Sequence, residues 1–283
     1  MTPNLSPIKL RVSSPLHTTF TPAADEWEAA RLVQERIFPA VRPPVPGLDY
    51  YGDWRPARGV SGDYIDYFLM KDGHLGIAVG DVCGKGLPAA LLTSSLHSTV
   101  RALRFQRNSS LPELVRTVHE LFYEICPENC YATLFVARYD PAEQRLHYVN
   151  AGHEPPFVLR KTGRHYRTIF LESGGPVIGM LRKSTYREGV VSLTPGDLVV
   201  AYTDGLCETR NAAGEEWGWP RFMEKLEYIS DRRSVDIVDI IMRETEAFSA
   251  GAPQFDDVTL WVGKVQESAD EPIWESEFAE AAA

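Results

Sequence analysis

The spacing of apolar residues divides the chain into helical and extended stretches. Apolar residues recur every three or four positions over five stretches, which predicts helices at 25–38, 87–105, 111–125, 220–228 and 235–248. Pro39 ends the first helix, because proline lacks the N–H that a helix interior needs. Pro88 and Pro112 fall in first turns, where that N–H has no partner in any case. A pair of helices therefore occupies the middle of the chain.

Short runs of β-branched and aromatic residues, bounded by turn residues, lie between these helices. They predict strands at 48–54, 64–70, 75–82, 131–138, 146–151, 156–159, within 186–203 and at 258–262. Strand groups interrupted by a helical pair are typical of an α+β fold built in layers. We find no linker that splits the 283 residues, and this length allows a sizeable core.

The two ends of the chain differ in composition from the middle. Residues 1–24 are rich in Pro, Ser and Thr and lack the basic start and apolar stretch of a secretory signal, so they are predicted to be a flexible extension. Residues 265–283 are acidic and Ala-rich, which predicts disorder, although Trp274 and Phe278 would also suit a short docking motif. No apolar run approaches the roughly 20 residues of a membrane span. We expect a cytoplasmic protein without membrane contact.

Charge and cysteine content exclude two other classes of protein. A formal net charge of −10 argues against sequence-independent binding to nucleic acid, which depends on Lys and Arg. The four cysteines, Cys83, Cys126, Cys130 and Cys207, lack the paired spacing of a zinc site. Free thiols in a reducing compartment are the simpler interpretation.

Four aspartates, Asp63, Asp81, Asp204 and Asp256, each adjoin an apolar, β-prone run. Strand ends on a rigid sheet can direct several carboxylates at one point, and such a cluster is stable only with cations between its members. Hard divalent ions with oxygen shells, Mg²⁺ or Mn²⁺, fit this chemistry. Asp-Gly and Gly-Asp are also common turn formers, so any one of these residues alone would carry little weight.

Five motifs appear in a fixed order: GDYID, GDVCGKGLPAALL, NAGHEPPFVLR, YTDGLCETRN and DDVTL. Together they resemble the metal-dependent protein serine/threonine phosphatases of the protein phosphatase 2C type, in particular the bacterial SpoIIE/RsbU branch. The resemblance covers about residues 27–264 and implies one phosphatase domain at 25–264. The expected fold is a four-layer α-β-β-α sandwich of two antiparallel sheets flanked by helices.

The resemblance also implies a catalytic centre with two ions, Mn²⁺ or Mg²⁺. Asp63, Asp81, Asp204 and Asp256 correspond to its metal ligands, with Asp81 bridging the ions, and the backbone carbonyl of Val82 would be a further ligand. Such ions activate water and neutralise the phosphate that it attacks. Arg58 lies five residues before Asp63, an offset at which animal-type members carry a phosphate-binding arginine, so it is the candidate for substrate binding.

Other residues in or near the motifs are candidates for supporting roles at the site. Asp66 and Asp257 adjoin expected ligands and either hydrogen-bond a coordinated water or have a structural role. Cys83 stands where animal-type members have a candidate acid histidine, and His153 stands where they have a further metal-binding aspartate. For His153 we expect a structural hydrogen bond, with substrate contact and acid catalysis as alternatives. Lys85 either contacts phosphate or faces water.

The function implied is hydrolysis of phosphoserine or phosphothreonine on a protein, and in the resembling branch that protein is usually a phosphorylated anti-sigma-factor antagonist. Helix 25–38 would link a regulator to the catalytic domain and could support a homodimer, or its apolar face could pack on its own sheet. A scaffold of the same fold without turnover and a hydrolase of small phosphoesters are the alternatives.

Overall fold

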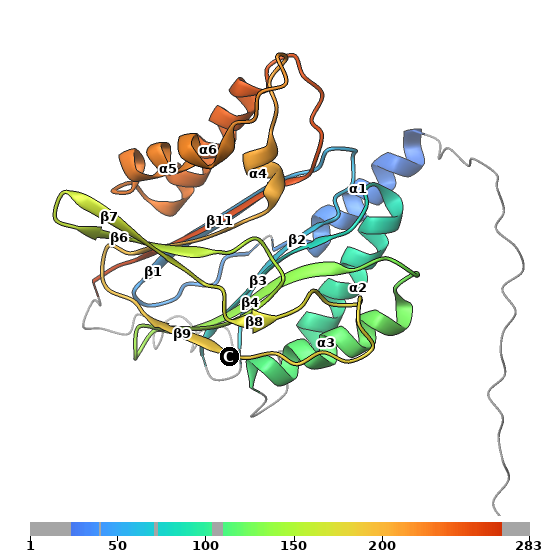
Figure 1. Ribbon diagram of the computed structural model, residues 1–283, viewed down its shortest axis with the longest axis horizontal. Helices are drawn as coiled ribbons and strands as arrows, with labels where there is room; N and C mark the ends of the chain where they lie inside the picture. The colour runs from blue at the N-terminus through green and yellow to red at the C-terminus, as the bar shows by residue number, and fades with distance from the viewer. Residues whose placement is uncertain (1–23, 40, 71–72, 104–109, 268–283) are drawn as a thin grey trace, which may run out of the picture.

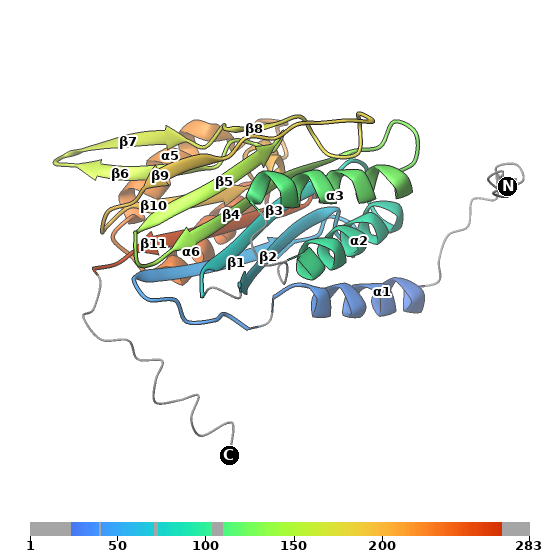
Figure 2. The ribbon, with the colours of Figure 1, turned by 90° about the horizontal axis from the view of Figure 1, so that it is seen from below.

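The computed structural model describes residues 24–39, 41–70, 73–103 and 110–267 (Figure 1). In this part of the chain two sheets pack face to face, and helices cover the outer face of each (Figures 1 and 2). The four-layer α-β-β-α sandwich predicted from the resemblance is confirmed. The predicted N-terminal extension and most of the acidic tail lie outside the described residues, apart from 24 and 265–267.

The first sheet has the strand order β1-β11-β10-β6-β7 and is antiparallel throughout. Its members are β1 (Leu48–Arg55), β6 (Phe157–Thr162), β7 (His165–Phe170), β10 (Leu198–Tyr202) and β11 (Val258–Val265). Helices α4 (Asp204–Glu208), α5 (Gly218–Ile229) and α6 (Ser234–Phe248) lie on its outer side (Figure 1). A buried cluster that includes Phe157, Phe222 and Ile241 joins these helices to the sheet.

The second sheet has the order β2-β3-β4-β5-β8, with β9 also paired to β5. Its strands are β2 (Asp63–Leu69), β3 (Leu75–Val82), β4 (Ala132–Asp140), β5 (Arg145–Ala151), β8 (Gly174–Gly175) and β9 (Gly189–Ser192). Helices α2 (Leu87–Leu103) and α3 (Leu111–Ile125) cover its outer face, and α1 (Ala24–Ile37) packs beside α2 (Figure 2). Ser110 and Glu113 form a capping box that starts α3.

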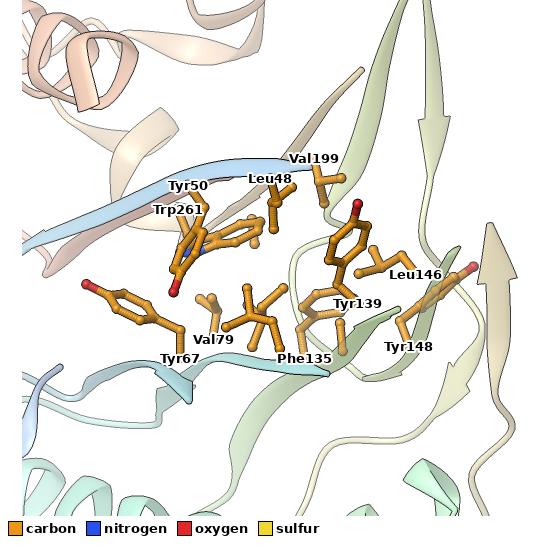
Figure 3. Packing of buried hydrophobic residues seen from close by; sticks show 14 of the residues in the cluster. Leu48, Tyr50, Tyr67, Val79, Phe135, Tyr139, Leu146, Tyr148, Val199 and Trp261 are labelled. Atoms are coloured by element: carbon orange, nitrogen blue, oxygen red, sulfur yellow. The ribbon is translucent and has the colours of Figure 1, made fainter. Parts of the chain in front are cut away.

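The inner faces of the two sheets enclose the central core, which is rich in aromatic residues (Figure 3). Tyr50 and Trp261 come from the first sheet, and Tyr67 and Phe135 come from the second. Successive strand residues point to opposite faces, so Ile65 and the neighbouring odd-numbered positions of β2 face this core. The even-numbered positions face α2 and α3 instead. This alternation decides which acidic residues of β2 can reach a site between the sheets.

Among the described residues no helix is both long and apolar enough to cross a bilayer.

Candidate metal centre

The four predicted aspartates meet at one edge of the sandwich, two from each sheet. Asp63 begins β2 and lies opposite Asp81, near the end of β3, in the antiparallel register. Asp204 follows β10 and begins α4, and Asp256 lies two residues before β11. Because β10 and β11 are antiparallel neighbours in the other sheet, the end of β10 lies beside the start of β11. Asp204 and Asp256 are both close enough to Asp81 for their charges to raise its pKa, so the two pairs of carboxylates lie together.

Asp63 is the deepest of the four, with a side chain that is almost completely buried. Its Oδ2 accepts hydrogen bonds from Thr203 Oγ1 at 2.8 Å and from Thr259 Oγ1 at 2.6 Å. Both hydroxyls come from the opposite sheet, so they fix the carboxylate across the gap between the sheets. Burial, followed by the charges of Asp81 and Asp257, raises the pKa of Asp63 well above its usual range.

Asp81 carries the clearest electrostatic sign of a cation site. Burial, the largest cause, and repulsion from Asp204, Asp256 and Asp257 together raise its pKa to about 7. The pKa of Asp204 is raised by burial and by Asp256 in the same way. Carboxylates that repel one another in a half-buried site are stabilised when a cation lies between them. The cluster therefore has the charge that a divalent ion requires.

The side chains as placed do not enclose an ion by themselves. Within the described ranges, no group of three or more His, Cys, Asp or Glu side chains is close enough to hold a metal ion together. Asp63 is turned toward its threonines, and Asp256 Oδ2 lies 2.7 Å from Lys85 Nζ. Mg²⁺ and Mn²⁺ are commonly bound by a few carboxylates with several waters completing the shell. The donor set fits such a water-rich site.

Asp257 fixes the loop that leads into Asp63. Its Oδ1 accepts from the N–H of Ala57 at 2.6 Å, and its Oδ2 accepts from the N–H of Gly62 at 2.6 Å. Arg58 belongs to the same loop, and its side chain is exposed. Asp257 thus holds the loop that contains Arg58, the candidate for phosphate binding. The same loop reaches Gly62, next to Asp63. Whether it also contacts a coordinated water stays a prediction.

Asp66 does not belong to the centre. It lies three residues after Asp63 on a strand, so it points to the opposite face of the sheet. There its carboxylate is completely buried and accepts hydrogen bonds from Arg101 Nε and Nη2 of α2, both at 2.5 Å. The sequence-based assignment of Asp66 to a metal-bound water is therefore corrected: the residue anchors α2 to the sheet.

Two polar residues that the sequence analysis did not single out hold the same loop from the helical side. Gln34 of α1 is buried and forms two hydrogen bonds of 2.7 Å with the backbone of Ser61, donating to its C=O and accepting from its N–H. Thr93 of α2 donates to the C=O of Gly62 at 2.7 Å. A glutamine within the apolar face of a predicted helix was the available signal for this contact.

His153 and Cys83 make contacts that stabilise the structure around them. The N–H of His153 donates to Asn150 Oδ1 at 2.7 Å, and Asn150 Nδ2 donates to the C=O of His153, which closes the NAGH turn. Burial lowers the pKa of His153 to about 4, so the ring is neutral near pH 7. Its Nδ1 lies 2.9 Å from Thr133 Oγ1, which accepts from the N–H of Asp81.

Cys83 Sγ lies 2.9 Å from Cys130 Sγ, and burial raises the pKa of the Cys83 thiol to about 11.

A pocket lies between α4, α6 and the loop before β11. Its lining combines two arginines with acidic and aromatic side chains: Arg55, Arg210, Glu208, Glu246, Phe255 and Asp256. Asp256 belongs both to this pocket and to the carboxylate cluster.

The fold is a sandwich of two sheets that are antiparallel except for the β5–β8 pair, with carboxylates gathered at one edge. Comparisons with known proteins find the same fold. The family described as Stage II sporulation protein E (SpoIIE) matches residues 71–266, and the chain belongs to this family. The SiaA-PP2C domain of Pseudomonas aeruginosa superposes with a TM-score of 0.73 at 19% identity, covering 86% of this chain and 96% of that domain. The likeness shows that the fold is of the PP2C type.

Two relatives are similar in sequence. Protein IcfG of Synechocystis is 31% identical over 261 residues, which cover 83% of this chain and 40% of that protein. Phosphoserine phosphatase RsbU of Bacillus subtilis is 30% identical over 190 residues, which cover 67% of this chain and 55% of that protein. The alignments thus span about half the length of these relatives. The resemblance seen in the sequence motifs is confirmed at the level of the family.

Proposed function

We propose that this chain is a metal-dependent phosphatase that hydrolyses phosphoserine or phosphothreonine on a partner protein. The observation that carries the proposal is the position of Asp81, whose raised pKa reflects both burial and three neighbouring carboxylates at one edge of the sandwich. Membership of the SpoIIE family and similarity to a protein named phosphoserine phosphatase support it.

In this proposal Asp63, Asp81, Asp204 and Asp256, with the carbonyl of Val82, hold two ions, Mn²⁺ or Mg²⁺. Bound ions of this kind supply an activated water and offset the charge of the phosphate. The protein contributes orientation: Thr203 and Thr259 fix Asp63 through their hydroxyls. Arg58, which is exposed, would bind the phosphate of the substrate through its planar guanidinium group.

The substrate in this proposal is a phosphorylated anti-sigma-factor antagonist in the cytoplasm. The pocket beside Asp256 would contact a residue that flanks the phosphorylated side chain, since its lining includes two arginines and an aromatic ring. Similarity to proteins named phosphoserine phosphatases RsbU and RsbP supports a phosphoprotein substrate. A homodimer through α1 is part of the proposal, because Leu32 and Val33 of this helix are 49% and 62% exposed.

The test is phosphate release from a phosphoserine protein with Mn²⁺, measured for the wild type, for Asp204→Asn and with chelator. We expect metal-dependent release that falls at least about a hundredfold in Asp204→Asn, because an amide is a weaker ligand for a hard ion. Asp231→Asn is the matched control, since Asp231 is exposed and pairs only with Lys161 among the contacts described. No release by a folded wild type with any metal would favour a scaffold, and equal preference for a small aryl phosphate would favour a small-phosphoester hydrolase.

The hydrogen bonds between α1 and Ser61 connect the helix on which a regulator would act with the metal centre. Replacing Gln34 with Ala would leave the buried N–H and C=O of Ser61 without these hydrogen bonds, two residues before Asp63. We expect the free energy of unfolding to fall by about 2 kcal/mol and Mn²⁺-dependent turnover to fall several-fold. Thermal denaturation and phosphate release measure the two effects. Glu35→Ala, on an exposed position of the same helix, should change neither, and an unchanged Gln34→Ala variant would refute the coupling.

A further inference from the structure

Lys85 reaches from the turn after β3 to the loop that precedes β11. Its Nζ donates to the C=O of Phe255 at 2.6 Å, lies 2.7 Å from Asp256 Oδ2, and stands 4.0 Å from the centre of the Phe255 ring. Glycines with positive φ flank it, Gly84 at +94° and Gly86 at +77°, a conformation that other residues rarely adopt. The turn therefore directs the lysine at Asp256, where three contacts with the loop before β11 hold its ammonium group.

Both carboxylate oxygens of Asp256 have partners in this arrangement. Oδ1 accepts from the N–H of Asp257 at 3.0 Å, and Oδ2 faces the ammonium group of Lys85. A divalent ion bound to Oδ2 would stand within a few ångströms of a positive charge, and like charges at that distance repel strongly in a partly buried site. The lysine and an ion at Asp256 consequently compete for the same oxygen.

We propose that Lys85 is a built-in counter-ion of the metal centre, which holds Asp256 in the metal-free protein and must leave it when a divalent ion binds there. The proposal rests on the metal site of the proposed function. Its consequence is that the lysine lowers the affinity for an ion at Asp256 and stabilises the carboxylate cluster when no ion is present. The site would then fill only at sufficient concentrations of divalent ion.

The proposal is tested by Mn²⁺ binding to chelator-treated protein, followed by calorimetry at fixed ionic strength. Lys85→Met removes the charge and keeps the length of the side chain, and we expect the dissociation constant of the weaker Mn²⁺ site to fall about tenfold. Lys85→Arg should stay close to the wild type. Lys161→Met is the matched control, because Lys161 pairs with Asp231 on the surface of the other sheet and its loss changes the net charge equally.

Thermal denaturation provides a readout that does not depend on turnover. Without metal, Lys85→Met should melt at a lower temperature than the wild type, since the carboxylates lose their internal cation, and saturating Mn²⁺ should remove the difference. Lys85→Gln, which can still donate a hydrogen bond to Phe255, serves if the Met variant does not fold. Equal or weaker Mn²⁺ binding by the charge-removing variants, with normal binding by the wild type, would overturn the counter-ion role alone. Absence of Mn²⁺ binding in the wild type would overturn the metal site as well.

Discussion

Replacing Asp81 with Asn is expected to stabilise the metal-free protein at pH 8 while it abolishes phosphate release. The carboxylate of Asp81 is largely buried beside Asp204, Asp256 and Asp257, and this environment raises its pKa to about 7. Keeping it ionised in the folded state therefore costs free energy, on the order of 4 kcal/mol for a shift of this size. Asn has nearly the same shape and carries no charge, so it removes this cost together with the proposed ligand.

The pH dependence follows from the direction of the same shift. Between the usual pKa of an aspartate, near 4, and about 7, the folded protein keeps a proton on Asp81 that the unfolded chain has lost. The folded state binds more protons in that window, so the free energy of unfolding of the metal-free protein decreases as the pH rises through it. The Asn variant should lose less stability over the same range.

Chemical denaturation of chelator-treated protein at several pH values between 4 and 8 measures this effect, and phosphate release measures the activity. Asp231→Asn should leave both the pH profile and the activity unchanged, because that residue is exposed. Adding Mn²⁺ should reverse the order of stability, since only the wild type has all of the proposed ligands. An Asn variant that is less stable than the wild type without metal at pH 8 would contradict the electrostatic account of the cluster.

The sequence was sufficient for the architecture because local signals and the motif order agreed. Helix α3 occurs at the predicted residues 111–125, where the capping box and a proline in the first turn mark its start. The four aspartates could be assigned to one cluster from the sequence, since each adjoins a strand. Local patterns could not show that these strands belong to two different sheets whose ends meet at one edge.

The errors have physical causes. Strand β7 was not predicted, because the segment His165–Phe170 is an edge strand with several exposed side chains and no clear apolar alternation. Helix α4 has five residues, too few for a helical period to show. Asp66 was assigned to the centre because it is close to Asp63 in sequence. Residues three positions apart on a strand point to opposite faces of the sheet, so Asp66 points away from the centre. Gln34 was missed because it forms its hydrogen bond with Ser61, 27 residues further along the chain, and local sequence patterns do not reveal contacts at that separation.

Replacing Gly205 with Ala should destabilise the protein, although the same exchange in a helix usually stabilises by about 0.5–1 kcal/mol. Gly205 follows Asp204 in α4, and a Cβ atom there would lie 2.0 Å from the C=O of Asp257 and 3.2 Å from Asp256 Cβ. The clash is with backbone, which cannot turn aside as a flexible side chain can. We expect the free energy of unfolding to fall by about 3 kcal/mol.

The same change should weaken Mn²⁺ binding, because the displaced loop carries Asp256 and fixes Gly62 through Asp257. Gly214→Ala is the control: Gly214 has a positive φ of +80°, but a Cβ there would meet nothing within 4 Å. It should cost about 1 kcal/mol from backbone strain and leave Mn²⁺ affinity unchanged. A Gly205→Ala variant with wild-type stability and affinity would show that α4 and the loop before β11 can move apart, and Asp204 and Asp256 would then not be held rigidly relative to each other.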